Sequence, residues 1–504
     1  MLDNLALGLS TAASPENLLW CFIGVALGTV IGMLPGLGSA TGVALLLPVT
    51  LALEPVTALI MLAGIYYGCQ YGSSISSILI STPGDSSSVV LTLDGYQMAR
   101  NGRAGAALAV SAISSFIAAI ITIVGLLLLA APIADLALDF GPPETLAIIL
   151  LGLSTIVSFA GDNVLRGITM AAVGLLVSTV GIASGFTTAR FTFGSVNLLG
   201  GIDFIAVLIG LFAIGEVLHQ IHRGGEKPIR ARFKDLLITR EDVRRMIPAT
   251  LRGTGLGFAL GVLPGAGATL ATFMSYGLEK QVSKHRSEMG KGAIEGVAAP
   301  EASNNAAANA SFIPTLALGI PGSGTTAVLL GAFIVFGLQP GPLLFEQQPA
   351  LVWGLLVSFV IGNLMLLVLN LPLAPVFAQA LRVPYSFLYP FILFISLLGA
   401  YAIGNNTFSL WVAFAAGVLG YFMKRFDFPA APLVLGLVLG PLLERSLVQT
   451  SALGRGDLLI LLQRPISAAF TIAAVLAIVA PLVLAGVRRA RARARHAAAR
   501  TPAA

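Results

Sequence analysis

Long stretches without a charged side chain recur along this chain, for example Ala104 to Ala134, Leu351 to Leu381 and Ile466 to Val487. A helix needs about 20 apolar residues to cross the hydrocarbon core of a bilayer. The chain has 504 residues, of which 56% are hydrophobic and 10% charged, and its mean hydropathy is +0.91. These values exclude an ordinary soluble class. The sequence therefore predicts an all-α polytopic membrane protein with about 11 crossings of the lipid bilayer.

A 15-residue segment occurs twice. Residues 24–38 read GVALGTVIGMLPGLG, and residues 253–267 read GTGLGFALGVLPGAG. At a constant offset of 229, eight positions are identical, and six of them are Gly or Pro. The matching positions in the first copy are Gly24, Leu27, Gly28, Gly32, Leu34, Pro35, Gly36 and Gly38. Such self-similarity indicates an internal repeat.

A second pair of Pro-Gly breaks lies farther along each half. Pro83 and Gly84 match Pro321 and Gly322 at an offset of 238, and hydroxyl residues follow both breaks. Paired hydrophobic segments that Gly and Pro interrupt are typical of secondary transporters whose binding site lies between the repeats. The alternative is a pair of GxxxG packing faces with incidental kinks. We favour the transporter interpretation, because packing alone does not require the break to be duplicated.

Charge patterning predicts that the two copies enter the membrane from opposite sides. Residues 1–99 contain no Lys or Arg, whereas residues 222–252 carry nine basic residues against four acidic ones, and residues 279–291 carry four more basic residues. Basic loops mark the cytoplasmic side. Both ends of the first segment are then extracytoplasmic and both ends of the second cytoplasmic. Each Leu-Pro-Gly-x-Gly becomes the tip of a re-entrant helical hairpin in an inverted-topology repeat.

This interpretation gives the following organisation. We expect membrane repeat 1 over 1–221, a basic cytoplasmic linker over 222–252, membrane repeat 2 over 253–487 and a basic cytoplasmic tail over 488–504. Each repeat begins with a hairpin, around 17–53 and 253–278, and continues with a Pro-Gly-broken helix, around 55–98 and 293–337. Further spans reach 219 and 487. The N-terminus is expected in the periplasm and the C-terminus in the cytoplasm.

A Pro-Gly break leaves backbone N–H groups unpaired on one half-helix and carbonyl groups unpaired on the other. The N–H end suits a carboxylate, and the carbonyl end suits Na+. Small hydroxyl and amide residues gather at these breaks, although bonding back to their own helix is the commoner role for any single one of them. The predicted substrate-binding residues are Gly36, Gly38, Ser39, Ser73, Ser74, Pro83, Gly84, Ser86, Gly265, Gly267, Thr269, Asn304, Asn305, Pro321, Gly322, Ser323 and Thr325.

Three residues are candidates for coupling to a cation, Na+ or H+: Glu301, Asn304 and Asp85. Glu301 lies in the apolar small-residue run APEASNNAAANA, and an ionisable group at membrane depth suggests a functional site. The alternative places Glu301 at the cytoplasmic end of its segment. Asp85 and Asp94 flank the first polar run, where a helix start in contact with water is the alternative. No arginine lies in the predicted core.

Enzyme and nucleic-acid functions find little support. The four histidines lie in or beside basic loops, so no HExxH or histidine-based metal cluster occurs, and no metal beyond Na+ is expected. GxxxxGK[ST] is absent, so the chain has no P-loop for ATP hydrolysis. We expect no catalytic residue, no organic cofactor and no nucleic-acid partner. Energy for transport must come from an ion gradient or another subunit.

Four stretches resemble the large membrane subunit of the tripartite tricarboxylate transporters, the TctA family. They read GTVIGMLPGLGSATGVALLLPVT, YYGCQYGSSISSILISTPGDSSSVVLTLDGYQMARNGRAGAAL, GVLPGAGATLATFMSYGLEK and APEASNNAAANASFIPTLALGIPGSGTTAVLLGAFIVFGLQPGPLLF. The resemblance covers both repeat cores, and the similarity in hydropathy extends over nearly the whole chain. It implies that the two Pro-Gly loops and the polar residues beside them form the site.

The resemblance also implies a bacterial inner-membrane complex. Its partners would be a small four-helix, TctB-like membrane subunit and a periplasmic, TctC-like solute-binding protein. The complex would import citrate or a related di- or tricarboxylate by Na+ or H+ symport. Two alternatives stay open at this point. One is a carrier of another organic acid that works without partners, and the other is a membrane scaffold or channel whose Pro-Gly segments serve only packing or a passive pore.

Overall fold

The computed structural model describes residues 2–34, 37–136, 141–154, 164–183, 188–220, 238–263, 267–341, 343–373, 376, 385–404, 406–477 and 479. The helices of the first half are α1 (Leu2–Ala12), α2 (Pro15–Met33), α3 (Gly38–Thr50), α4 (Pro55–Ile80), η1 (Ser86–Ser88), α5 (Leu91–Met98), η2 (Ala99–Arg103), α6 (Ala104–Leu136), α7 (Pro142–Ser154), α9 (Val164–Ser178), η4 (Val196–Leu198), α10 (Phe204–Leu208), η5 (Ile209–Ile214) and α11 (Gly215–Gln220).

The second half contains helices of similar lengths. They are α12 (Arg240–Val262), α13 (Gly267–Val282), α14 (Glu295–Ala310), α15 (Phe312–Leu318), α16 (Gly324–Val335), α17 (Leu344–Gln347), α18 (Pro349–Asn370), α20 (Tyr385–Gly404), α21 (Thr407–Arg425), α22 (Ala430–Leu453) and α23 (Ile460–Gln463). The described strands are β1 (Gly181–Ile182) and β2 (Ala189–Arg190), which pair antiparallel.

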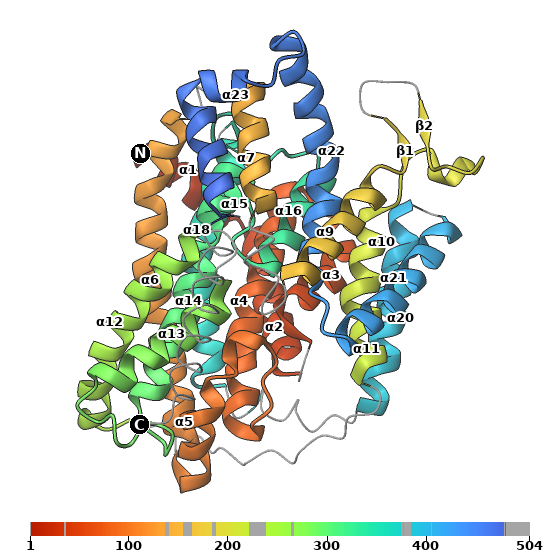
Figure 1. Ribbon diagram of the computed structural model, residues 1–504. Coiled ribbons are helices and arrows are strands. Elements are labelled where there is room, and N and C mark those ends of the chain that lie inside the picture. The colour runs from red at the N-terminus through yellow and green to blue at the C-terminus, as the bar shows by residue number, and fades with distance from the viewer. Residues whose placement is uncertain are drawn as a thin grey trace, which may run out of the picture.

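Among the described residues, five helical segments are long and apolar enough to cross a membrane. These are Pro15–Met33, Leu91–Leu129, Pro349–Asn370, Thr407–Arg425 and Ala430–Leu453. Seven shorter apolar helices accompany them. In Figure 1 the helices form one bundle, with α12 and α13 on one side, α10, α20 and α21 on the other, and α2, α4 and α14 between them. The chain is therefore an all-α multi-pass membrane protein, as predicted.

Glycines bring two helix pairs into close contact, and the two pairs correspond in sequence. On α2, a Cβ at Gly28 would overlap the carbonyl oxygen of Ile65 on α4. On α12, a Cβ at Gly257 would overlap the carbonyl oxygen of Ser303 on α14. The glycines are 229 residues apart, and their contacts are 238 residues apart, the two offsets of the sequence repeat. Gly24 and Gly32 repeat this relationship with Gly253 and Gly261. The duplicated glycines thus build the same helix pair twice, by the close backbone packing that associates helices in lipid.

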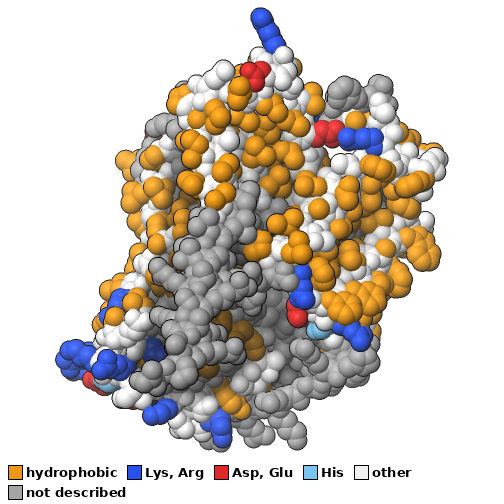
Figure 2. Space-filling view, viewed as in Figure 1, with side chains coloured by type: hydrophobic (Ala, Val, Ile, Leu, Met, Phe, Trp, Pro, Cys, Tyr) orange, Lys and Arg blue, Asp and Glu red, His pale blue; other side chains and the backbone are white. Residues whose placement is uncertain are grey.

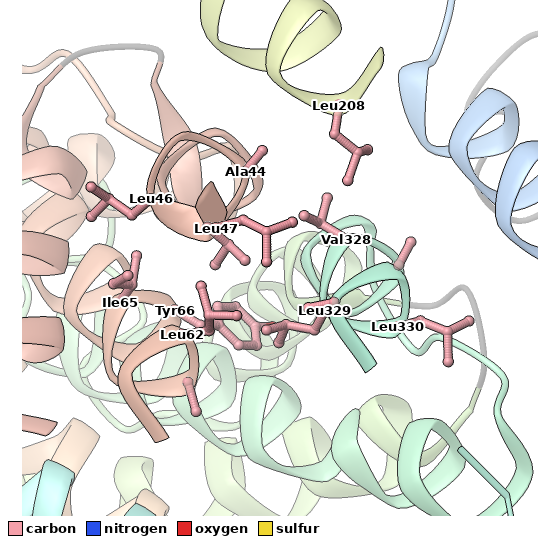
Figure 3. Close-up of a cluster of buried hydrophobic side chains, with 14 of the residues drawn as sticks. Ala44, Leu46, Leu47, Leu62, Ile65, Tyr66, Leu208, Val328, Leu329 and Leu330 are labelled. Carbon is pink, nitrogen blue, oxygen red and sulfur yellow. The ribbon is translucent and has the colours of Figure 1, made fainter. Parts of the chain in front are cut away.

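A buried apolar cluster holds the broken helices of the two halves together. Figure 3 shows side chains from α3, α4, α10 and α16 pointing toward one another. At its centre, Leu47 of α3 and Leu329 of α16 are each no more than 1% exposed. Close packing of this kind fixes the ends of the helices relative to one another. The labelled members are Ala44, Leu46, Leu47, Leu62, Ile65, Tyr66, Leu208, Val328, Leu329 and Leu330.

Asp94 fixes the connection between α13 and α14 against α5. Its carboxylate is fully buried and accepts hydrogen bonds from the backbone N–H groups of Gly290, Gly292 and Ala293 at 2.7–2.9 Å. The hydroxyl of Tyr276 donates a further hydrogen bond at 2.9 Å. The alternative of a carboxylate in contact with water at a helix start is therefore wrong for Asp94, because three backbone donors far along the chain surround it.

Basic side chains lie mainly at one end of the bundle. Figure 2 shows them at the lower end, over α12, α13 and the helices beside them, while apolar side chains cover much of the rest of this face. Several pair with acidic groups of neighbouring helices, such as Arg252 with Glu279 at 2.6 Å and Arg103 with Asp242 at 2.8 Å. α12 begins at Arg240, where Thr239 and Asp242 form a capping box, so the last part of the predicted linker, residues 222–252, belongs to this helix.

Candidate functional site

The two Leu-Pro-Gly-x-Gly motifs interrupt the helices in the same way. α2 ends at Met33 and is followed by Leu34 in an extended conformation, with φ −79° and ψ 119°. α12 ends at Val262, and Leu263 has φ −78° and ψ 118°. The next helices, α3 and α13, start at Gly38 and Gly267, whose φ values are +62° and +63°. These positive angles favour glycine, which explains why both motifs end in this residue.

The second breaks also correspond. α4 ends before Ser81, with φ +55°, and α15 ends before Gly319, with φ +66°. Their sequence separation is the repeat offset of 238. After each Pro-Gly, a polar side chain caps the next helix: Asp85 accepts from the N–H of Ser87 at the start of η1, and Ser323 accepts from the N–H of Thr326 at the start of α16. Each half therefore contributes two helix starts that follow a break.

These helix starts surround one large cavity of about 1120 Å³. Its wall includes the first residues of α3, α13 and α16, together with the Pro83–Ser87 loop. N-terminal ends of helices present unpaired N–H groups and a partial positive charge. The lining residues are Leu37, Gly38, Ser39, Ala40, Thr41, Tyr66, Gln70, Pro83, Gly84, Asp85, Ser86, Ser87, Phe212, Gly267, Ala268, Thr269, Leu270, Phe273, Ser323, Gly324, Thr325 and Lys424.

Hydroxyl pairs join the halves across this cavity. The Oγ of Ser39, on α3, lies 2.8 Å from the Oγ1 of Thr325, on α16. The Oγ of Ser86, on η1, lies 2.8 Å from the Oγ1 of Thr269, on α13. α3 follows the first break of the first half, and it contacts α16, which follows the second break of the second half. In the same way, α13 follows the first break of the second half and contacts η1, which follows the second break of the first half. This reciprocal contact is the arrangement that a two-fold repeat produces.

The carboxylate of Asp85 lies at the start of α3. Its Oδ2 accepts from the backbone N–H of Ser39 at 3.0 Å and from the Ser39 hydroxyl at 2.7 Å. Its Oδ1 accepts from the N–H of Ser87 at 3.2 Å. One protein carboxylate therefore already uses the donors at this helix start. The starts of α13 and α16 contribute no acidic residue of their own to the described wall, but Asp85 lies close to both, through Ser86 to Thr269 and through Ser39 to Thr325.

Lys424 is the one basic side chain among the described residues on the wall of this cavity. It lies in the last turn of α21, lines the cavity, and forms an ion pair with Glu216 of α11. The side chain of Glu216 is 2% exposed and that of Lys424 is 33% exposed. Because Lys424 is followed by Arg425 at a helix end, the sequence suggests only a cytoplasmic anchor at this position. Its place on the cavity wall depends on the packing of α21 against α11.

A second polar cluster lies inside the bundle around Glu301, which is 1% exposed. The Ser74 hydroxyl lies 2.9 and 2.8 Å from the two carboxylate oxygens, and the Ser115 hydroxyl lies 2.9 Å from Oε1. Asn305 donates to Ser115 at 2.8 Å and to Glu301 Oε1 at 3.3 Å. Glu301 is therefore buried in the first half of α14, among hydroxyl and amide groups of neighbouring helices.

The structure divides the predicted site residues into three groups. Nine substrate-binding candidates line the cavity, and so does the cation candidate Asp85; the nine are Gly38, Ser39, Pro83, Gly84, Ser86, Gly267, Thr269, Ser323 and Thr325. Ser74, Asn305 and Glu301 belong to the buried cluster instead. Ser73, Asn304, Pro321 and Gly322 do not line the cavity, and Gly36 and Gly265 lie outside the described residues.

Each residue that does not line the cavity has a different environment. Ser73 lies behind the wall, where its hydroxyl accepts from the N–H of Asp85 at 2.7 Å. Gly322 packs against Ser311, as Gly84 packs against Ser73. Asn304 is 1% exposed, and its side-chain amide has no hydrogen-bond partner in the described part of the chain. Sequence reasoning missed Tyr66, Gln70, Phe212, Phe273 and Lys424, which have no break or motif to mark them.

No group of three or more His, Cys, Asp or Glu side chains suited to a metal ion occurs within the described residues. Among the residues of the buried cluster, oxygen atoms come from one carboxylate, hydroxyls and amides, the ligands that hard cations such as Na+ take in proteins. Consecutive residues of α4 contact the two acidic residues: the Ser74 hydroxyl donates to the Glu301 carboxylate, and the Ser73 hydroxyl accepts from the backbone N–H of Asp85.

The fold and the cavity define a polytopic all-α membrane protein in which broken helices of two repeated halves enclose a polar site. The model of the tripartite tricarboxylate transporter TctA family matches residues 18–435. The chain belongs to this family.

Two relatives from Agrobacterium vitis are similar to this chain. The uncharacterized 52.8 kDa protein in the TAR-I ttuC' 3'region is 46% identical over 492 residues, which cover 97% of this chain and 98% of that protein. The uncharacterized protein in the TAR-II ttuC' 3'region is 49% identical over 212 residues, 42% of this chain and 88% of that protein. No solved structure matches the chain significantly.

Proposed function

We propose that this chain is the large transmembrane subunit of a binding-protein-dependent secondary transporter in the bacterial inner membrane. It imports citrate or a related di- or tricarboxylate by symport with Na+ or H+. It has no enzymatic activity of its own. A TctB-like small membrane subunit and a TctC-like periplasmic solute-binding protein complete the complex. Membership of the TctA family supports the substrate class and the partners.

The observation that carries this proposal is the convergence of helix starts from both halves on one cavity. The N-terminal residues of α3, α13 and α16 all line it. Oriented N–H groups bind carboxylates without a permanent positive charge, and the partial charge of a helix start adds to this attraction. A passive scaffold needs no such convergence, because packing alone is satisfied by the glycine contacts of α2 with α4 and of α12 with α14.

The repeats are inverted in our proposal. The basic side chains of α12 and of the connection after α13 then lie in the cytoplasm, whereas the acidic residues around α2 lie in the periplasm. The N-terminus is periplasmic, and the C-terminus is cytoplasmic. Transport proceeds when the hairpins of one repeat move relative to the rest of the bundle, exposing the cavity alternately to the two sides. The hydroxyl pairs Ser39–Thr325 and Ser86–Thr269 break and re-form in this movement.

Cation coupling uses Glu301 and Asp85 in our proposal, which is supported by the contacts of these two residues with Ser74 and Ser73 of α4. Asp85 faces the cavity, and Glu301 is buried behind it. Binding of Na+ or H+ at Glu301 removes the cost of an unpaired buried charge. Asn304 lies on the same helix and contributes its unpartnered amide to the cation in our proposal. The cation then stabilises the conformation in which Ser73 and Ser74 are aligned, which favours binding of the anion.

The test is uptake of labelled citrate and a panel of di- and tricarboxylates by cells that express the chain with its partners, with and without a Na+ gradient. Ser323→Ala, on the cavity wall, is compared with Ser10→Ala, an exposed serine whose hydroxyl bonds only to its own helix. We expect saturable, gradient-dependent uptake that Ser323→Ala reduces at least tenfold and Ser10→Ala leaves unchanged. Absence of uptake of every carboxylate by the assembled wild-type complex would exclude the proposed function and favour a scaffold or channel.

A further inference from the structure

The cavity holds two charged groups of opposite sign, and they are not equivalent. The carboxylate of Asp85 already accepts hydrogen bonds from the N–H and hydroxyl of Ser39, from the N–H and hydroxyl of Ser87 and from the Ser86 hydroxyl. The ammonium group of Lys424 pairs with Glu216, which does not line the cavity. Lys424 therefore has one face toward a buried protein carboxylate and another toward the open space where an anion would lie.

A structural role alone explains this lysine poorly. A cation in the last turn of a helix is stabilised by the helix dipole. Arg425, the next residue, already supplies such a cation to α21 from an exposed position. It donates to the Tyr421 hydroxyl at 3.0 Å. An ion pair in a poorly solvated place contributes little net stability, because desolvation of both charges offsets their attraction. The partly exposed ammonium on a cavity wall is better explained by a ligand.

A ligand with two carboxylates needs two separate sources of positive potential. The starts of α13 and α16 supply one through their N–H groups, although the Asp85 carboxylate lies on the same wall and reaches them through Ser86 and Ser39. A second carboxylate, several ångströms away on the same molecule, requires another partner. Within the described part of the chain, Lys424 is the single fully charged cation that lines the cavity, and a cavity of about 1120 Å³ has room for a small hydrated diacid beside it.

We propose that Lys424 is a specificity-determining residue that binds the second carboxylate of the substrate and thereby selects di- and tricarboxylates over monocarboxylates. In the empty cavity Glu216 neutralises the ammonium group and keeps it in place. When the substrate binds, its distal carboxylate becomes a second acceptor for the ammonium protons. This inference rests on the proposed function, because it concerns the recognition of carboxylates in the same cavity.

The experiment measures binding of succinate and of butyrate, which have equal carbon chains but two and one carboxylates, to the purified full-length protein in detergent. Affinities follow from the rise of the unfolding temperature with ligand concentration. We expect the wild type to prefer succinate. Lys424→Gln should weaken succinate binding at least tenfold and change butyrate binding less than twofold. Lys424→Arg should retain the preference, and Arg425→Gln, the matched control one residue away, should behave as the wild type.

A charge swap separates ligand binding from a merely structural ion pair. The double variant Lys424→Glu with Glu216→Lys restores an ion pair between α11 and α21 but removes the cation from the cavity wall. We expect the swapped protein to fold and still lack the preference for succinate. Recovery of the preference in the swapped protein, or its persistence in Lys424→Gln, would overturn the inference. A wild type that binds succinate no better than butyrate would overturn it too, while leaving transport of carboxylates intact. A wild type that binds no carboxylate at all would overturn the inference, whereas the proposed function would be overturned only by the absence of uptake in the assembled complex.

Discussion

The hydroxyl of Ser39 lies 2.8 Å from the hydroxyl of Thr325, although 286 residues separate them in the sequence. Ser39 belongs to the first turn of α3 and Thr325 to the first turn of α16, so this contact joins the broken helices of the two halves at the cavity wall. The Asp85 carboxylate accepts from the same Ser39 hydroxyl. A small network therefore connects the cavity wall, a carboxylate and both repeats.

The first prediction concerns this contact. Thr325→Val removes the hydroxyl and keeps the shape of the side chain, whereas Thr325→Ser keeps the hydroxyl. A buried hydrogen bond contributes about 1 kcal/mol, and an unpaired buried partner costs somewhat more. We expect a double-mutant cycle of Thr325→Val with Ser39→Ala to give a coupling of about 1 kcal/mol in the unfolding free energy of the purified protein. The conservative variant Thr325→Ser should preserve most of the stability. Additive effects in the cycle would show that the contact contributes nothing.

The second prediction tests the glycine contacts between α12 and α14. Gly257→Ala places a Cβ against the carbonyl oxygen of Ser303, and overpacking of this kind costs about 1–3 kcal/mol. Gly255→Ala on the same helix is the matched control, since a Cβ there meets no atom within 4 Å, and alanine favours a helix by up to about 1 kcal/mol over glycine. We expect Gly257→Ala to lower the unfolding temperature and Gly255→Ala to leave it unchanged or raise it. Equal effects would contradict the close packing.

The third prediction addresses Glu301. Glu301→Gln keeps the size of the side chain and its contacts with Ser74 and Ser115 but removes the charge. We expect accumulation driven by a Na+ or H+ gradient to fall at least tenfold, while exchange of labelled for unlabelled substrate, which needs no net cation movement, persists. Glu346→Gln, at an exposed position, is the control. Undiminished gradient-driven accumulation in Glu301→Gln would remove this residue from the coupling mechanism.

The fourth prediction is a pH dependence of stability at the start of α12. Burial by itself raises the pKa of Asp242, but hydrogen bonds from the Thr239 backbone and from the Arg103 guanidinium outweigh it, so the net pKa lies below the ordinary value of 3.8. A carboxyl whose pKa is lower in the folded protein stabilises that protein above its unfolded pKa, and this contribution disappears as the pH falls through the folded value.

The expected loss of stability therefore lies below about pH 4, and it is small, because an ion pair with a partly exposed arginine contributes about 0.2–1 kcal/mol. Unfolding temperatures of the purified protein between pH 3 and pH 7 measure it. Asp242→Asn should flatten this part of the pH profile, and Arg103→Gln should reduce the slope. Arg100→Gln, which changes an exposed neighbour, should leave the pH profile unchanged. If the profile of Asp242→Asn is the same as that of the wild type, groups other than Asp242 cause the loss of stability at low pH.

Local chemistry made several features predictable from the sequence alone. Charge-free runs of 20 and more residues predicted a membrane protein, because unpaired charges are expensive in lipid. The duplicated glycines and the Pro-Gly pairs predicted two repeated halves with broken helices, since each residue type restricts the backbone by itself. Gly38 and Gly267, with their positive φ angles, show how directly the motif determined the backbone. The cavity residues next to the breaks followed from the same argument.

Only the tertiary structure decided which polar residues share a site. Asn305 and Ser74 carry the same kind of polar groups as Ser323 and Ser39, yet they contact Glu301 inside the bundle and not the cavity. Lys424 looks like an ordinary anchor at a helix end, and the packing of α21 against α11 brings it to the cavity wall. A sequence records local backbone preferences, whereas the direction of a side chain on a long helix depends on how distant helices pack around it.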